Sequence, residues 1–290
     1  MKHLKIIILI FLLTFFTSCS DSQPKYVSNV LFTESEDNFK MVVEFYDFSS
    51  GNENFCTVEA EGDNLESLCI ALQSENDFNY RLCENIFITP DILENSTNLV
   101  FYTLNSMQIP VATNVWCFIG ENLPAVNKTE LIQTKLYNFS SNKGITSGVM
   151  TVFDEDSNYN GAVIISGGKM TKYLTENQWK ILSVITGDTD NVSLKFRDGS
   201  MYAKLKKCNA YFYGEKETNI NFTVSLKEFK GVADAINSKD LLVDFLKKEI
   251  ENTIYQLYND AVIADRCNLY WYADHKNIDN NKINVKVTVI

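Results

Sequence analysis

Histidine is scarce in this chain of 290 residues, and its scarcity limits the chemistry available to the protein. The only histidines are His3 and His275, and His3 lies in an N-terminal segment that we expect to be removed. One remaining histidine excludes a His-rich metal site. Any Ser–His or Cys–His catalytic pair would need His275, which has Asp274 but no nucleophile beside it, so we interpret it as a surface residue.

Basic residues are also in the minority. The sequence has 26 Lys and Arg against 37 Asp and Glu, which gives a net charge of −11. A nucleic-acid partner is therefore not expected, because phosphate backbones are bound by excess positive charge. With 45% hydrophobic and 22% charged residues, the composition is that of a globular protein, and the length suits about two domains.

Long apolar runs are missing after Phe16, where none exceeds five residues, so no transmembrane helix is expected there. Before that point the chain has a basic start, Met1–Lys5, and an apolar run, Ile6–Phe16, interrupted only by Thr14. The run is too short to cross a bilayer, which needs about 20 residues. It fits the hydrophobic region of a signal peptide.

The run ends at Thr17-Ser18-Cys19, which resembles a bacterial lipobox with Phe16 in place of the usual aliphatic residue. We predict that residues 1–18 are a lipoprotein signal peptide and that Cys19 is lipidated. The alternative is an ordinary secretory signal cut near Ser18, with Cys19 incidental. Loss of Lys2 and Lys5 with the signal would change the net charge from −11 to −13. Two acyl chains would then hold this acidic protein on a membrane without crossing it.

Six further cysteines would remain after Cys19, and an even number permits three disulfides in an exported protein. No CxxC pair is present, so neither a zinc site nor a redox motif is indicated. Cys69 and Cys117 lie among apolar residues, where a free cysteine behaves as a small core side chain. We favour free, buried cysteines over a disulfide framework.

The first unit of the chain mixes strand and helix patterns. Alternating apolar residues predict two strands within 27–47, and the capping-box spacing at 63–66 predicts a helix from Leu65. Further strands are expected at 84–89, 99–102 and 114–119. Residues 120–160 are polar and poor in periodicity, except for a possible short helix at 129–137. We interpret this stretch as the boundary between two units.

The second unit has clearer patterns. Apolar residues around Gly167-Gly168 predict a hairpin, and Thr175 with Gln178 predicts the start of a helix. A long amphipathic helix is expected from Lys239, with Leu246 and Ile250 on its apolar stripe and Lys247 opposite. The expected strands are 162–165, 170–174, 192–196, 201–213, 220–226 and 283–289.

Strands and helices that mix without a strict βαβ order predict an α+β fold, with mixed sheets and packed helices in two main units. The predicted organisation is a signal peptide at 1–18, an N-terminal α+β domain at 19–120, a shortened middle region at 121–160 and a C-terminal α+β domain at 161–290.

No catalytic, cofactor-binding or metal-binding residue is assigned. Asp154–Gly161 is spaced like the start of a calcium loop, but Tyr159 and Ile165 stand where an EF-hand needs Gly and Glu. Gly167-Gly168-Lys169 lacks the surroundings of a phosphate loop. The aromatic triplets at 211–213 and 270–272 can stack sugars or apolar nutrients, but such triplets more often reflect the two faces of a strand.

Several segments, in their order along the chain, resemble one known family: the Ger(x)C family, the lipoprotein C subunits of bacterial spore nutrient-germinant receptors. The similar segments are Glu61–Leu68, Ile86–Ile88, Gly161–Glu176 continuing to Ile181-Leu182 and Thr186-Gly187, Lys204–Cys208, Ile220–Leu226, Leu246–Ile254, Ala264-Asp265 and Ile283–Val289. The chain departs from the family at Ser20-Asp21, where Trp-Asp is usual, and in its shorter middle region and its shorter segment Asn277–Lys282.

The resemblance implies a non-enzymatic subunit on the outer face of the spore inner membrane, held there by Cys19. It implies two membrane partners, a polytopic A subunit and a transporter-like B subunit, with contact to a nutrient germinant at most indirect. It names no catalytic residue and no cofactor. The main alternative is a solute-binding or adhesive surface lipoprotein of vegetative cells, and a secreted hydrolase is the third.

Overall fold

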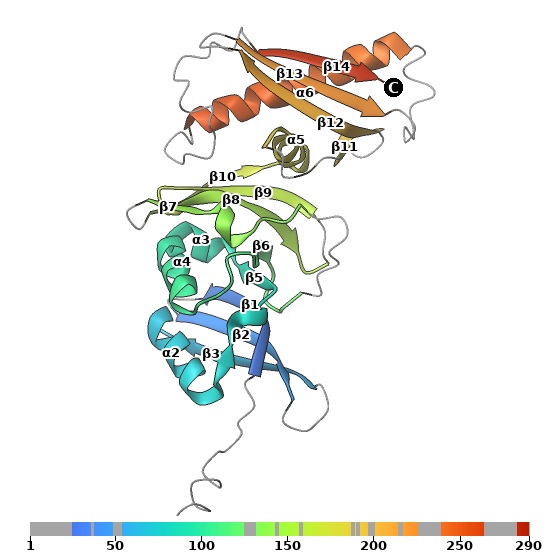
Figure 1. Ribbon diagram of the computed structural model, residues 1–290. Coiled ribbons are helices and arrows are strands. Elements are labelled where there is room, and N and C mark those ends of the chain that lie inside the picture. The colour runs from blue at the N-terminus through green and yellow to red at the C-terminus, as the bar shows by residue number, and fades with distance from the viewer. Residues whose placement is uncertain are drawn as a thin grey trace, which may run out of the picture.

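The computed structural model describes residues 25–35, 38–48, 54–124, 132–142, 145–156, 159–186, 189, 192–196, 201–213, 217–225, 239–263 and 283–289. These residues form two sheets with helices packed on them, so the predicted α+β class is confirmed. Figure 1 shows the larger sheet with its helices at one end of the molecule and the smaller sheet at the other.

The large sheet has the strand order β10-β9-β8-β6-β5-β1-β2-β3 among the described residues. Its centre is parallel, because β1, β5, β6 and β8 run the same way, while β2 and β3 at one end and β9 and β10 at the other are antiparallel to their neighbours. Two short strands, β4 and β7, pair with β1 and β8. The bounds are β1 (Lys25–Ser35), β2 (Asn38–Asp47), β3 (Asn54–Gly62), β4 (Phe78–Asn79), β5 (Asn85–Ile88), β6 (Asn114–Ile119), β7 (Ser140–Asn142), β8 (Ile145–Asp154), β9 (Tyr159–Ser166) and β10 (Lys169–Leu174).

Helices cover one face of this sheet (Figure 1). They are α2 (Leu65–Asn76), α3 (Pro90–Asn95) and α4 (Thr97–Ser106). This part of the chain also contains two 3-10 turns, η1 (Tyr80–Leu82) and η2 (Leu136–Asn138). The main hydrophobic core lies between these helices and the strands. A second, smaller core occupies the opposite face and consists of Leu31, Val42, Phe87, Trp116, Phe118 and Phe153.

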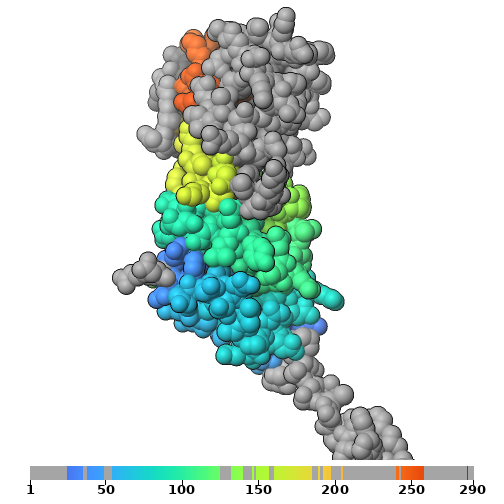
Figure 2. Space-filling model, turned by 90° about the vertical axis from the view of Figure 1, so that its left-hand side faces the viewer, coloured from blue at the N-terminus to red at the C-terminus, as the bar shows by residue number. Residues whose placement is uncertain are grey.

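The small sheet has the order β11-β12-β13-β14, in which only β13 and β14 are parallel. Its strands are β11 (Val192–Phe196), β12 (Met201–Tyr213), β13 (Glu217–Ser225) and β14 (Ile283–Val289), and its long helix is α6 (Lys239–Ile263). The remaining helix, α5 (Glu176–Thr186), contacts β9 and β10 of the large sheet as well as β11, β12 and α6. In Figure 2 the yellow segment that contains α5 lies between the green part of the molecule and the orange α6.

Two strand and helix predictions differ from the structure. Residues 99–102, predicted as a strand, belong to the helix α4. Four consecutive apolar residues do not distinguish a strand from a helix, and here Val100 and Phe101 are buried while Leu99 and Tyr102 are exposed, as expected for helical spacing. The predicted short helix at 129–137 is not found in its described part, where only the turn η2 begins at Leu136.

The stretch 120–160 contains β8, an interior strand of the large sheet. Its polar appearance comes from residues such as Thr146 and Thr151, which are both buried. The Thr151 hydroxyl donates to the carbonyl of Ile132 at 2.6 Å, which removes the cost of burying it. The sheet continues through β9 and β10 as far as Leu174.

Candidate functional site: the joint between the two sheets

The structure does not describe two of the residues that the sequence singles out. Cys19 and His275 both fall outside the described residues, so lipidation of Cys19 stays a prediction. The chain is described from Lys25, where β1 begins. Among the described residues no helix is long and apolar enough to cross a membrane, and no cluster of His, Cys, Asp and Glu could hold a metal ion.

The described cysteines are core residues. Cys56, Cys69, Cys83 and Cys117 are free, and the last three are buried. Burial raises the pKa of each of these three thiols to about 12, so none of them is a thiolate at neutral pH. The expectation of free, buried cysteines is confirmed for these three positions, while the side chains of Cys208 and Cys267 lie outside the described residues.

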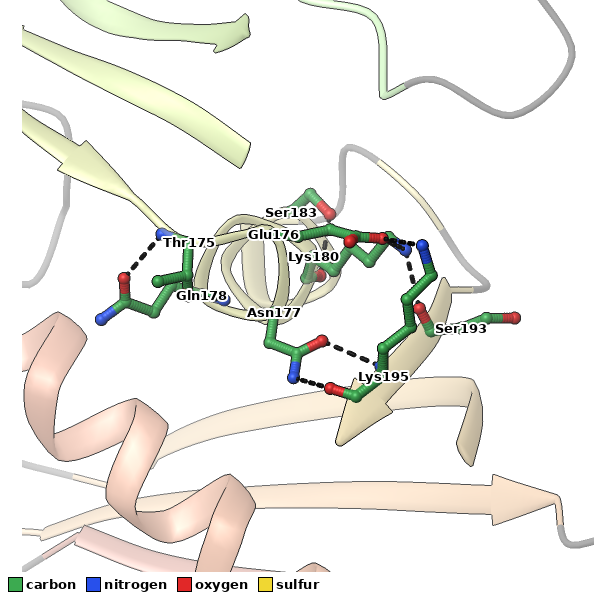
Figure 3. Close-up of polar contacts among 8 residues, drawn as sticks. All are labelled: Thr175, Glu176, Asn177, Gln178, Lys180, Ser183, Ser193 and Lys195. Atoms are coloured by element: carbon green, nitrogen blue, oxygen red, sulfur yellow. Dashed lines mark hydrogen bonds and ion pairs between the residues drawn. The ribbon is translucent and has the colours of Figure 1, made fainter. Parts of the chain in front are cut away.

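Helix α5 contacts both sheets, and we call this helix with its capping residue Thr175 the joint. Its first turn is fixed by the predicted capping box (Figure 3). The amide of Thr175 donates to the Oε1 atom of Gln178 at 2.8 Å, and the amide of Gln178 donates to the Thr175 hydroxyl at 3.3 Å. These reciprocal bonds satisfy amides that a helix N-terminus leaves without partners. The start of the joint is therefore determined by residues that are close together in the sequence.

The side of α5 that faces the large sheet is apolar and closely packed. Trp179 is 4% exposed, and its indole Nε1 atom donates to the hydroxyl of the buried Thr151 at 2.9 Å. The chain also approaches closely at Gly161, which has a φ of +99°. A Cβ atom there would lie 2.0 Å from the carbonyl oxygen of Leu174, so only glycine lets β9 pass this close to the start of α5.

Polar side chains of α5 hold the edge strand β11 of the small sheet. Figure 3 shows Asn177 directed at the backbone of Lys195, whose amide donates to the Asn177 Oδ1 atom at 3.0 Å, while the Nδ2 atom of Asn177 donates to the Lys195 carbonyl. Lys180 donates to the carbonyl of Ser193 at 2.8 Å. Glu176 pairs with Lys180 and, at 3.4 Å, with Lys195.

These contacts give the edge of β11 partners that an edge strand otherwise lacks. Unpaired backbone groups at a sheet edge invite pairing with another chain, and covering them is the usual protection. A further bond joins α5 to α6, from the Nε2 atom of Gln178 to the Oε1 atom of Gln256 at 3.2 Å. The joint thus holds the small sheet through the edge strand β11 and through α6. These hydrogen bonds and ion pairs fix the position of the small sheet.

A second polar feature, the asparagine row, crosses the large sheet. Asn29, Asn85 and Asn114 are opposite one another on β1, β5 and β6, and Glu44 and Lys135 continue the row at its two ends. The side-chain amide of Asn85 donates to the Asn29 Oδ1 atom at 2.8 Å, and its own Oδ1 atom accepts from Asn114 at 3.1 Å.

The interior of the row is fully hydrogen-bonded. Trp116 also donates to the Asn85 Oδ1 atom, at 3.0 Å, and Asn29 donates to Glu44. Burial raises the pKa of the Glu44 carboxyl, and the bond from Asn29 opposes that rise. The three asparagines are suited to alignment, because their amides are hydrogen-bonded and are neither nucleophiles nor acids or bases.

No protein-family model matches the chain, and no curated protein does. Among solved structures, the chain is similar to one described as "Crystal Structure of the GerBC protein", with 14% sequence identity and a TM-score of 0.47. The similarity covers 90% of this chain and 95% of that one. The similarity concerns the fold alone. We base the proposals below on the residues of this chain.

Sequence reasoning found the capping box of the joint but not its partners. Thr175 and Gln178 are three positions apart, so their pairing is visible in the sequence. Asn177 and Lys195 meet only because the chain reverses between α5 and β11. The asparagine row was missed for the same reason, since its members belong to separate strands that the sequence does not pair.

Proposed function

We propose that this protein is a membrane-tethered lipoprotein subunit of a spore germinant receptor. It acts with a polytopic A subunit and a transporter-like B subunit in nutrient-triggered germination. The observation that carries the proposal is the apolar run that ends directly at Cys19, followed by segments in the order typical of the Ger(x)C family. The tether places the protein on the outer face of the spore inner membrane.

In this proposal the protein works through its surface and its tether rather than through catalysis. Acyl chains on Cys19 would confine it to the membrane that holds its partners. Confinement raises the effective concentration of each partner, so that weak contacts suffice for assembly. The buried, protonated thiols of Cys69, Cys83 and Cys117 and the contacts by which α5 positions the small sheet are consistent with this role.

The proposal is tested by the release of dipicolinic acid from spores after nutrient addition. We expect Cys19→Ala to impair release, because an untethered subunit loses the effective concentration that keeps it beside its partners. His275→Ala is the matched control and should leave release near the wild-type level, since the proposed role uses no catalytic histidine.

Two outcomes would contradict the proposal. A His275→Ala protein that accumulates normally but does not support germination would favour a hydrolase. Unchanged germination after complete deletion, in a strain without a second receptor of this type, would favour a surface lipoprotein of vegetative cells.

A further inference from the structure

A group of aromatic side chains lies at the end of the large sheet where the described chain begins. Tyr26, Tyr46 and Phe55 are opposite one another on β1, β2 and β3, and so form a row across three strands. The ring centroids of Tyr46 and Phe55 are 5.1 Å apart. Phe48 follows β2, and its ring stacks on Tyr46 with the centroids 6.3 Å apart and forms a T-shaped pair with Tyr26 at 6.0 Å. We call these four residues the aromatic patch.

The patch lies on the face of the sheet opposite α2. Side chains alternate along a strand, so Phe45 and Cys56, the neighbours of Tyr46 and Phe55, point into the main core on the α2 side. Phe55 is 53% exposed, and the other three rings are partly exposed. Phe55 also belongs to β3, the strand at this end of the sheet order. Four clustered rings are therefore available to a partner.

The position of the patch in the chain indicates which partner it meets. Five residues separate Cys19 from Lys25, and Tyr26 comes next. A fully extended chain covers about 3.3–3.6 Å per residue, so Lys25 lies within about 20 Å of Cys19. Figure 1 shows the start of β1 at the end of the molecule remote from the small sheet. A membrane that held Cys19 would therefore be next to the aromatic patch.

The chemistry of the patch suits the headgroup region of a bilayer. Tyrosine rings combine an apolar body with a hydroxyl and are enriched at membrane–water interfaces, and phenylalanine adds apolar area. Without residues 1–18 the protein is acidic, with a net charge of −13, so anionic headgroups would repel it. Contact with the membrane must then come from uncharged groups such as these rings.

We propose that the aromatic patch docks on the lipid surface and fixes the orientation of the protein on the membrane. The proposal rests on the proposed function, which supplies the tether at Cys19. Contact between the membrane and the four rings at one end of the large sheet would restrict the tilt of that sheet. Because α5 holds the small sheet against the large one, the small sheet would be oriented as well. A second copy of the chain or another protein on the same patch are the competing occupants.

The test uses the secreted chain carrying Cys19→Ser, which has no acyl anchor. Flotation measures the fraction of this protein that partitions onto phosphatidylcholine vesicles. We expect the double variant Phe48→Ser/Phe55→Ser to partition about tenfold more weakly, because both rings lose their contact with lipid. The matched control, Tyr102→Ser/Tyr137→Ser, removes two rings that are each 64% exposed but lie on α4 and η2, and it should partition like the parent. Phe48→Trp/Phe55→Trp should restore or strengthen partition.

A second measurement uses the lipidated full chain in vesicles. Phe55→Trp adds a fluorophore in the patch to the three native tryptophans, and we expect brominated phosphatidylcholine to quench more of the indole fluorescence in this variant than in the parent. Equal flotation of the serine variant and the parent, or equal quenching by bromine of the Phe55→Trp variant and the parent, would overturn the proposal. If the serine variant changes only self-association, the occupant is a second copy of the chain and the lipid proposal is wrong.

Failure of the tether is distinguished by detergent phase partitioning of the chain with intact Cys19. If it stays in the aqueous phase, like Cys19→Ala, the proposed function is wrong whatever the patch does. If it enters the detergent phase, the predicted tether at Cys19 is correct. If flotation of the Cys19→Ser forms then does not depend on Phe48 and Phe55, the proposal for the aromatic patch is wrong. Equal unfolding midpoints of parent and serine variant would exclude misfolding as the cause of a difference.

Discussion

The two sheets bury their strands in different ways. In the large sheet every residue of β5 is buried, and in β6 only Ile119 is exposed. In the small sheet β11 alternates, with Val192, Leu194 and Phe196 buried and the residues between them exposed. The interior strands of the large sheet are covered by helices on one face and by the smaller core on the other. The large sheet is thus stabilised by two apolar layers and β11 by one.

The largest expected effect concerns the second layer of the large sheet. Phe87 has no exposed surface, and its ring lies 5.8 Å from that of Phe118 and 5.7 Å from that of Phe153. We expect Phe87→Ala to lower the free energy of unfolding by about 3–5 kcal/mol, because it leaves a cavity among these rings. Denaturant unfolding measures it, with Tyr102→Ala on the exposed surface as the control. Equal losses would mean that the smaller core does not stabilise the sheet.

A somewhat smaller effect tests the single layer of the small sheet. Leu246 on α6 is fully buried, so we expect Leu246→Ala to cost about 2–5 kcal/mol. Its neighbour Lys247 is 47% exposed and only 3.7 Å from Glu251 in an i,i+4 pair, so Lys247→Ala should stay within about 0.5 kcal/mol. The contrast in unfolding midpoints checks the orientation of α6. If Lys247→Ala were as damaging as Leu246→Ala, the helix would be turned the other way.

The smallest effect concerns the joint. Asn177→Ala removes both bonds to the backbone of Lys195, and we expect it to lower stability by about 1 kcal/mol, since these bonds are exposed. Hydrogen exchange of the Lys195 amide should accelerate, while that of amides in β5 should not change. Asn160→Ala, which removes an exposed bond of 3.3 Å to Asp154, is the control. Equal protection of Lys195 in both variants would mean that α5 does not hold the β11 edge.

The same difference between the sheets explains how much could be predicted from the sequence. Periodic burial makes a strand or helix recognisable, and β11 and the stripe of α6 were found in this way. The hairpin of β9 and β10 was found from its apolar residues and its Gly167-Gly168 turn. Burial on all sides removes the period. β8 lies between β6 and β9 and contains buried threonines, so its sequence resembles that of a polar, irregular segment. The short apolar run of α4 resembles a strand in the sequence.

Contacts between distant residues could not be predicted, because they depend on strand pairing. Tyr26, Tyr46 and Phe55 become neighbours only through the register of β1, β2 and β3. Asn177 meets Lys195 only once α5 lies along β11. Cys19, by contrast, is indicated by a local sequence pattern, the apolar run that ends at this residue, but it lies outside the described residues.

The asparagine row also restricts how the large sheet can assemble. Asn29, Asn85 and Asn114 come from parallel strands that are joined by long connections, so no tight turn sets their alignment. A shift of β5 by one residue would point Asn85 into the main core and separate it from both partners, at the cost of several unsatisfied amides. The row therefore penalises misaligned pairings while the sheet forms, and it selects one register from several that would bury similar apolar area.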